Sequence, residues 1–285
     1  MLSVTTCDGW VLAGEVCEAV GAPVARAVGV HAMMCDRRTL DRPRGAGLAS
    51  ALARAGVEVH LYDLRGHGQS TGGDPRVVTY DDLVLQDIPA LLRATAALEP
   101  RLPLVLVGHS LGAHAGLAAV GSDRGLAVAG VVSLGGNIWM RRTEPDARRW
   151  AVKRLSMELW GAIAWFGGRF PTRALRMGTD DEALPYVRQL VGFSRTGRWS
   201  GARDWDGALA RVTCPVLSVT SRDDRWMCRP VSAARWLEAL PQTEHRIVGD
   251  RPGDPRGVGH MGLATDPRMA SIHREISGWV RSVAR

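Results

Sequence analysis

Short, wholly apolar runs alternate with helix-like segments along most of this chain, and this alternation restricts the fold more than any other feature. A run such as 104–107, which has no polar position, predicts a strand buried on both faces of a sheet. Strands are predicted at 10–13, 27–30, 57–62, 104–107, 127–134, 216–219 and 246–248. Helices are predicted at 46–55, 81–98 (with a kink at Pro89), 111–120, 231–240 and 266–280. The pattern indicates an α/β fold, a mostly parallel sheet with helices on both faces.

Residues 136–210 interrupt this alternation and contain no clear strand pattern. The segment holds six of the ten tryptophans, Trp139, Trp150, Trp160, Trp165, Trp199 and Trp205. Basic pairs lie between them at Arg141/Arg142, Arg148/Arg149 and Lys153/Arg154. Two compatible interpretations follow: a solvated charged helix face over a tryptophan-filled interior, or an inserted helical lid over a pocket. We therefore expect a core formed by 1–135 and 211–285, with a helical lid at 136–210.

The charge and hydropathy of the chain limit its partners. The formal net charge is +7, but Lys153 is the only lysine and the other basic residues are arginines spread along the chain. This distribution favours compositional bias, so no nucleic-acid partner is predicted. No run of 18 apolar residues exists, and the N-terminus lacks a basic stretch followed by an apolar one. We expect no membrane span and a cytoplasmic location; the sequence does not predict an oligomeric state.

Cofactor and metal motifs are missing from the sequence. Its five cysteines include no C-x-x-C pair, and its histidines show no H-x-x-x-H spacing, so neither a disulfide framework nor a metal site is predicted. Lys153 follows valine, which excludes a phosphate-binding Gly-Lys loop. The glycines at 66, 68 and 72 precede Asp74-Pro75 where a dinucleotide-binding helix would begin. No cofactor is expected.

The strongest local motif is Gly108-His109-Ser110-Leu111-Gly112, between a predicted strand and a predicted helix. A serine on such a sharp turn needs neighbours without side chains, because strand and helix approach closely there. The turn exposes the serine hydroxyl, and the following helix directs its N-terminal amides toward the same point. Ser110 is therefore a candidate nucleophile.

A nucleophilic serine needs a base and an orienting carboxylate. Among the histidines, His260 is preferred because it lies in the glycine-rich loop 257–262 after the last predicted strand. His109 is better explained by packing and His67 by turn structure, while His114, one helical turn beyond the serine, could face the sheet or the solvent. His31 ends a predicted strand, and His60, His245 and His273 lack a supporting context. The strand at 216–219 leads to Asp223-Asp224, which offers two candidate acids. The order Ser, Asp, His fits one known triad architecture.

These motifs resemble those of the α/β-hydrolase superfamily over nearly the whole chain. The segment Asp63-Leu64-Arg65-Gly66-His67-Gly68-Gln69-Ser70 is similar to that family's D-x-R-G-x-G-x-S turn, and 108–112 is similar to its nucleophile elbow. Asp223-Asp224-Arg225 resembles the acid loop, and Gly259-His260 the histidine loop. The resemblance implies Ser110, Asp224 and His260 as a catalytic triad, with Asp223 as the alternative acid.

The resemblance also implies an oxyanion hole. Family members carry a His-Gly pair after an early strand, and the matching residues here are His31-Ala32-Met33, which assigns the donors to the backbone N–H groups of Met33 and Leu111. The alanine departs from the common pattern but resembles a bacterial His-Ala-Met subgroup of uncharacterised hydrolases.

The expected function is hydrolysis of a small, apolar carboxylic ester or thioester through a serine acyl-enzyme. An acyltransferase and an acyl-CoA thioesterase with the same triad are the alternatives, followed by a non-catalytic binding protein on this scaffold.

Overall fold

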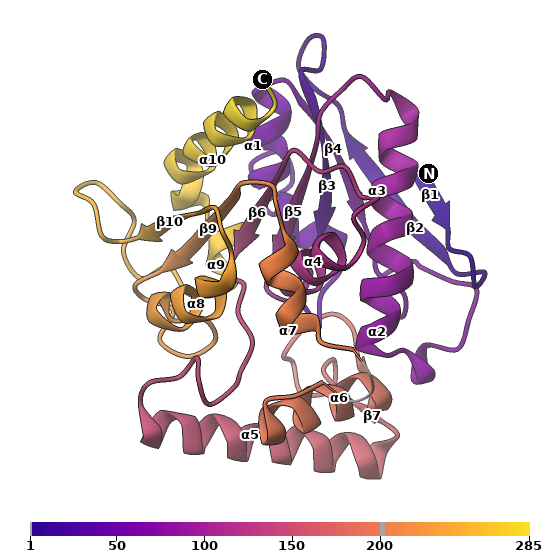
Figure 1. Ribbon diagram of the computed structural model, residues 1–285, viewed down its shortest axis with the longest axis vertical. Helices are drawn as coiled ribbons and strands as arrows, with labels where there is room; N and C mark the ends of the chain where they lie inside the picture. Colours follow the sequence, from indigo (N-terminus) through magenta and orange to yellow (C-terminus); the bar gives the residue numbers. More distant parts are fainter. Residues whose placement is uncertain (1, 200–202) are drawn as a thin grey trace.

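Eight strands form one central sheet in the order β1-β2-β4-β3-β5-β6-β9-β10 (Figure 1). The computed structural model describes residues 2–199 and 203–285; Met1 and residues 200–202, the latter within the predicted lid, lie outside the described residues. The strands are β1 (Leu2–Thr5), β2 (Val11–Cys17), β3 (Ala25–Val30), β4 (Val57–Tyr62), β5 (Leu104–His109), β6 (Gly130–Leu134), β9 (Val216–Ser221) and β10 (Thr243–Val248).

The sheet is mostly parallel, as the apolar runs predicted. From β4 through β3, β5, β6 and β9 to β10 every neighbouring pair is parallel, whereas β2 runs antiparallel to both β1 and β4. All positions of β5, β6 and β9 are buried, which explains their lack of polar alternation. The edge strand β1 was not predicted, because half of its four residues are exposed and it carries little apolar pattern. Parallel strands bring their carboxyl ends to one edge, where the candidate residues follow β3, β5, β9 and β10.

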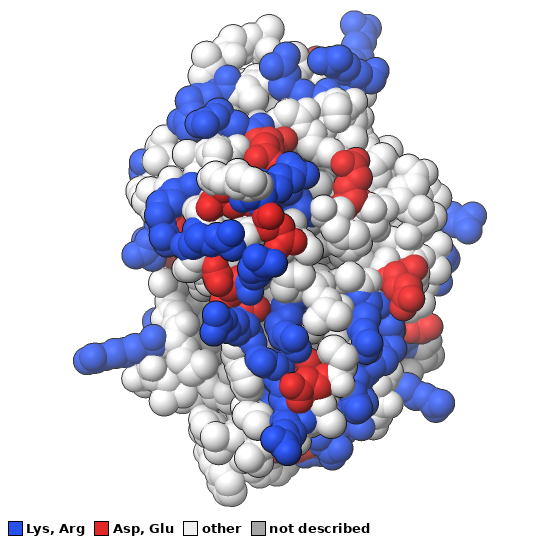
Figure 2. All heavy atoms as spheres, turned by 90° about the vertical axis from the view of Figure 1, so that its left-hand side faces the viewer, with Lys and Arg blue, Asp and Glu red and all other residues white. Residues whose placement is uncertain are grey.

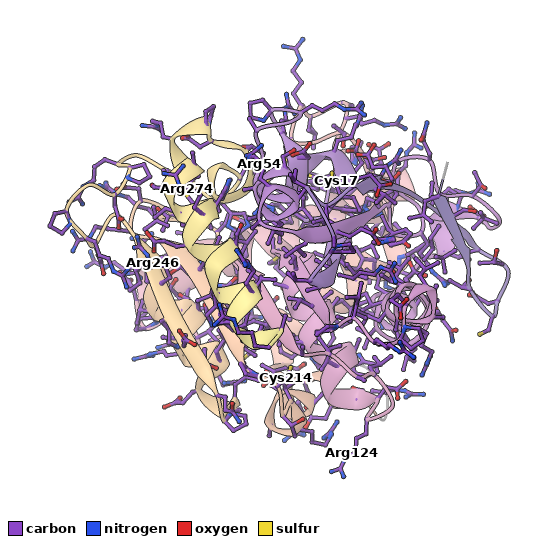
Figure 3. All side chains as sticks on the ribbon, turned by 90° about the horizontal axis from the view of Figure 1, so that it is seen from above. Cys17, Arg54, Arg124, Cys214, Arg246 and Arg274 are labelled. Carbon is purple, nitrogen blue, oxygen red and sulfur yellow. The ribbon has the colours of Figure 1, made fainter. Side chains whose placement is uncertain are left out.

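Helices cover both faces of the sheet, which confirms the predicted layers. The helices α3 (Ile88–Leu98), α4 (Leu111–Ser122) and α8 (Pro230–Trp236) pack into one hydrophobic cluster. The helices α1 (Leu48–Arg54), α9 (Gly262–Thr265) and α10 (Ala270–Val283) pack into the other. Seen from above, Arg54 of α1 and Arg274 of α10 lie on one side of the sheet, and Arg124, just after α4, lies on the opposite side (Figure 3).

The predicted helix at 81–98 contains a wide turn. It consists of α2 (Tyr80–Asp82), a π-helical turn at Leu83–Asp87, and α3, with Pro89 in the first turn of α3. Proline has no N–H for the ladder, so the hydrogen-bonding pattern changes just before it. The carboxylate of Asp87 is fully buried. It accepts two hydrogen bonds from Arg65, one from Nε at 2.7 Å and one from the backbone N–H of Arg65 at 2.9 Å. These bonds anchor the turn that follows β4.

The segment between β6 and β9 lies across the end of the sheet that carries the candidate residues (Figure 1). It contains α5 (Ala147–Gly167), α6 (Leu184–Thr196) and α7 (Trp205–Ala208). It also contains two short strands, β7 (Arg169–Phe170) and β8 (Glu182–Ala183), which pair with each other. The sequence showed no clear strand pattern here, because two-residue strands leave no periodicity. Its buried residues join the same hydrophobic cluster as α4, and the division into domains stays a prediction.

Charge and apolar side chains on α5 are distributed differently from the predicted charged face. Lys153 is buried, and its Nζ lies 3.0 Å from Oε2 of the buried Glu144. Large apolar residues of α5 are exposed instead: Val152, Leu155, Leu159, Trp165 and Phe166. Of the segment's other tryptophans, Trp199 and Trp205 belong to the buried core. Basic residue spacing alone could not identify the buried cation, because its carboxylate partner is nine residues away on a preceding loop.

The surface carries basic and acidic side chains close together. On the face seen in Figure 2, Lys and Arg side chains are interspersed with Asp and Glu. In the C-terminal part, Arg246 forms an ion pair with Asp254 at 2.6 Å and Arg222 forms one with Asp250 at 3.1 Å. The charges of these two arginines are thus neutralised locally. Within 2–199 and 203–285, no helix combines the length and the apolar character needed to cross a membrane.

Candidate active site

Ser110 occupies a strained turn between β5 and α4. Its backbone has φ 50° and ψ −108°, a conformation that costs a residue with a side chain about 1–3 kcal/mol. The neighbouring glycines allow the close packing that holds it. A Cβ on Gly112 would lie 2.3 Å from the carbonyl oxygen of Val30, and one on Gly108 would lie 2.5 Å from the backbone of α4. The local sequence therefore folds as the predicted strand-turn-helix motif.

The backbone amides of Met33 and Leu111 are the predicted oxyanion donors. Neither N–H group forms a hydrogen bond within the described residues. The two loops are tied together, because the N–H of Gly112 donates to the carbonyl of His31 at 3.1 Å. The N–H of Ser110 donates to Leu134 at 2.8 Å and fixes the turn to β6. The predicted oxyanion donors therefore lie on two segments that are joined directly.

His260 and Asp224 form a buried pair at the same edge of the sheet. Nδ1 of His260 lies 2.7 Å from Oδ2 of Asp224, and both side chains are less than a tenth exposed. The loop between β10 and α9 needs close contact with β6 to place the imidazole. A Cβ on Gly135, whose φ is 56°, would lie 2.9 Å from Cε1 of His260. Sequence reasoning missed this glycine, which makes room for the ring.

The carboxylate of Asp224 is stabilised in its charged form. Burial by itself would raise its pKa, but the hydrogen bond from His260 and those from the backbone N–H groups of Met227 and Cys228, both 2.9 Å, lower the pKa below the usual aspartate value. Asp223 has a different contact, since its Oδ2 accepts the N–H of Gly257 at 2.7 Å. Asp224 therefore contacts the imidazole, and Asp223 holds the start of the histidine loop.

Ser110 and His260 face a common space without a direct hydrogen bond. Nε2 of His260 is buried and has no hydrogen-bond partner among the described residues. Both side chains line a cavity of ≈ 490 Å³ and a second, smaller cavity of ≈ 60 Å³.

The larger cavity is lined mainly by flexible apolar side chains. Five of the nine methionines border it: Met33, Met34, Met177, Met227 and Met261. Among the described residues, Arg42 is the one charged residue that lines it. Trp160 of α5 borders both cavities, and Met157 of the same helix borders the smaller one. The unbranched methionine side chain adapts to ligands of different shape, so the cavity suits an apolar group.

The other histidines have separate structural environments. Burial lowers the pKa of His109 to about 3, and its Nε2–H donates to the carbonyl of His260 at 3.2 Å. Burial likewise lowers the pKa of His114 to about 3; its Nδ1 accepts the hydroxyl of Tyr80 at 3.1 Å. His114 also lines the smaller cavity beside Ser110. His31 and His67 lie behind the Met33 loop, with ring centroids 5.0 Å apart.

The sheet order, the helices on both faces and the serine turn are those of an α/β hydrolase, and the chain is a hydrolytic enzyme of the serine hydrolase class. Within that class, residues 37–181, just over half of the 285, match the model of the Hydrolase_4 family, described as serine aminopeptidase, S33. The chain belongs to this family. The predicted superfamily is confirmed, and the His-Ala-Met subgroup stays a prediction. None of the curated proteins compared with the chain matches it.

Solved structures with the same fold cover nearly the whole chain. A soluble variant of monoglyceride lipase from Saccharomyces cerevisiae has a TM-score of 0.69 and 15% identity, covering 100% of this chain and 96% of that chain. A monoacylglycerol lipase from Paleococcus ferrophilus has a TM-score of 0.63 and 16% identity, covering 95% of this chain and 99% of that chain. An esterase from Pyrococcus furiosus has a TM-score of 0.64 and 16% identity, covering 99% of this chain and 88% of that chain. At these identities the likeness concerns the fold.

Proposed function

We propose that the enzyme hydrolyses a small, apolar carboxylic ester through a covalent acyl-serine at Ser110. The observation that carries this proposal is the shared cavity: Ser110 and His260 border a methionine-lined space, and His260 is paired with Asp224 on its other side. A hydroxyl, an imidazole and a buried carboxylate in this order supply nucleophile, base and orienting acid. Asp224 is favoured over Asp223 by its contact with the imidazole.

The proposed reaction has two halves, acylation of Ser110 and hydrolysis of the acyl-serine, and the same groups act in both. Oγ of Ser110 attacks the ester carbonyl while Nε2 of His260 takes its proton, and Asp224 stabilises the imidazolium that forms. The N–H groups of Met33 and Leu111 bind the negatively charged oxygen of the tetrahedral intermediate. The imidazolium gives its proton to the departing alcohol, which leaves the acyl group on Ser110. Water then attacks the acyl-serine with His260 again as base, and the acid is released.

The cavity lining favours an ester over a substrate with a free ammonium group. The family description names an aminopeptidase, whose substrate carries such a group. Within the described residues neither cavity that contains Ser110 is lined by a carboxylate, and the larger one has Arg42 as its charged residue. A buried cation without a counter-charge is strongly disfavoured. In this proposal α5 forms a lid whose Trp160 provides an apolar wall.

The decisive experiment compares Ser110→Ala with Ser122→Ala, an exposed serine at the far end of the same helix. On p-nitrophenyl esters from acetyl to dodecanoyl, Ser110→Ala is expected to lower turnover about 10⁴-fold or more, with unchanged folding by circular dichroism. Ser122→Ala should match wild type, and a fluorophosphonate should label both wild type and Ser122→Ala. Equal turnover in wild type and Ser110→Ala contradicts the proposal, as does faster cleavage of amino-acid p-nitroanilides.

Two alternative functions use the same triad, and one assay distinguishes each of them from ester hydrolysis. A thioesterase would cleave an acyl-coenzyme A faster than the oxygen ester with the same acyl group. An acyltransferase would convert added alcohol to a new ester, detectable by mass spectrometry, in preference to releasing acid. A non-catalytic binding protein would show neither turnover nor labelling of Ser110.

A further inference from the structure

A buried glutamate from the segment between β6 and β9 contacts the loop that carries the Met33 amide. Glu182 belongs to β8 and is 2% exposed. Its Oε1 accepts a hydrogen bond from the backbone N–H of Met34 and lies 3.3 Å from Nε2 of His67. The proposed reaction uses neither Glu182 nor His67, although both are buried and ionisable. Glu182 is 148 residues distant from Met34 in the sequence, so no local pattern could indicate this contact.

The same segment also binds the backbone carbonyl of Met34. Met34 has φ 63°, a left-handed conformation that is unfavourable for a side-chain-bearing residue. Its carbonyl accepts the N–H of Thr179 at 2.8 Å, so both backbone groups of Met34 are bound by residues 179–182. A Cβ on Gly178 would lie 2.1 Å from the Met34 carbonyl oxygen. The segment thus supports a strained backbone by close approach.

A neutral histidine fixes the preceding peptide plane. Burial and, to a smaller extent, the charge of His67 lower the pKa of His31 to about 4. Nδ1–H of His31 therefore donates to the carbonyl of Ala32 at 2.7 Å, while Nε2 accepts the N–H of Leu64 at 3.1 Å. The Ala32 carbonyl and the Met33 N–H share one planar trans peptide, so they point in opposite directions. Holding the carbonyl on the His31 side directs the Met33 N–H away from it.

His67 and Glu182 form a buried pair. Burial disfavours the protonated imidazole, but the Glu182 carboxylate more than offsets this and raises the pKa of His67 to about 9. A hydrogen bond from an amide to an ionised carboxylate is stronger than one to a neutral acceptor. The ion pair therefore strengthens the bond that holds the Met34 amide.

We propose that Glu182, paired with His67, is a positioning residue for the oxyanion hole. It fixes the Met33–Met34 peptide, while His31 fixes the Ala32–Met33 peptide, and together they set the direction of the Met33 N–H. This inference rests on the proposed function, because it assumes that this amide binds the oxyanion. The segment that covers the cavity thereby contributes to catalysis through the backbone it supports.

The test compares Glu182→Ala and Glu182→Gln with the control Asp181→Asn, whose carboxylate instead lies beside Arg169 and Arg173. Two quantities are measured: KM for a p-nitrophenyl ester, and Ki for a trifluoromethyl ketone with the same acyl chain, which forms a tetrahedral oxyanion on Ser110. An oxyanion donor contributes about 10²- to 10³-fold, so a misdirected one should raise Ki/KM and lower kcat by about tenfold or more in Glu182→Ala.

Glu182→Gln retains an acceptor for the Met34 N–H, so its kcat should fall less, by about threefold to tenfold. Some loss is expected because a neutral acceptor forms a weaker hydrogen bond. This partial rescue distinguishes positioning from general damage, and the variant decides the question if Glu182→Ala does not fold. An unchanged Ki/KM in whichever variant folds overturns the inference. The proposed function is judged separately: if Ser110→Ala keeps turnover, that proposal is wrong, whereas an inactive Ser110→Ala with an unaffected Glu182 variant overturns only the role of Glu182.

Discussion

Nδ1 of His260 lies 2.7 Å from Oδ2 of Asp224, although a second aspartate, Asp223, is one residue away. The two carboxylates leave the end of β9 in different directions. Asp224 accepts backbone N–H groups from its own loop, and Asp223 accepts the N–H of Gly257 at the start of the histidine loop. One acid is therefore placed to orient the imidazole, and the other to hold the backbone that carries it.

We expect Asp224→Asn to lower kcat about 10⁴-fold, because an amide neither stabilises the imidazolium nor holds the required tautomer. Asp223→Asn retains an oxygen that accepts the Gly257 N–H and should lower kcat less than about tenfold, since one hydrogen bond contributes about 1 kcal/mol. Steady-state kinetics on one activated ester compares the two variants. A larger loss in Asp223→Asn would reverse the assignment of the acid.

Replacing Gly112 by alanine should destabilise the protein by about 1–3 kcal/mol, because the added methyl would overlap the Val30 carbonyl, 2.3 Å away. The matched control is Gly278→Ala in α10, where an added Cβ meets no atom within 4 Å. Removing a glycine from that helix interior should raise stability by about 0.5–1 kcal/mol. Urea denaturation measures both, and equal effects of the two substitutions would argue against the tight strand-to-helix contact.

Trp160 borders both cavities that contain Ser110, so Trp160→Ala should enlarge the space beside the serine and move the preferred ester to a longer acyl chain. The ratio of kcat/KM for the longest to that for the shortest ester is expected to rise about tenfold, the contribution of one or two methylene groups. Trp165→Ala, on the same helix but 60% exposed, serves as control. A parallel loss on all esters would mean that Trp160 supports the fold and does not limit the cavity.

The His67–Glu182 pair should make stability depend on pH. The pKa of His67 is raised to about 9, above the value of about 6.5 expected when unfolded, so the native state binds the proton more tightly. Its stabilising contribution is complete below about pH 6.5 and is lost as the pH rises through about 9. Glu182→Gln should flatten this part of the curve, with the neighbouring Asp180 and His31 unchanged. Urea denaturation from pH 6 to 9.5 tests this, and parallel curves for wild type and variant would contradict it.

Local patterns predicted most of the sheet and its helices. Strands such as β5 and β9 are buried on both faces and therefore apolar at nearly every position, which a sequence shows directly. The turn at Ser110 was also predictable, because the close approach of strand and helix requires glycines within two residues of the serine. Features without a local pattern were missed: the edge strand β1, the two-residue strands β7 and β8, and the burial of Lys153 beside Glu144.

By itself, the sequence determined an α/β hydrolase with a serine at a strand-to-helix turn, because backbone sterics and hydrophobic periodicity act over short distances. Only the tertiary structure decided which of two adjacent aspartates faces His260, that Gly135 makes room for the imidazole, and that Glu182 binds the Met34 amide. Those relationships join Glu182 of β8 and residues from the loops that follow β3, β6, β9 and β10. Chain folding brings them within hydrogen-bonding distance, and no spacing along the sequence encodes an approach of that kind.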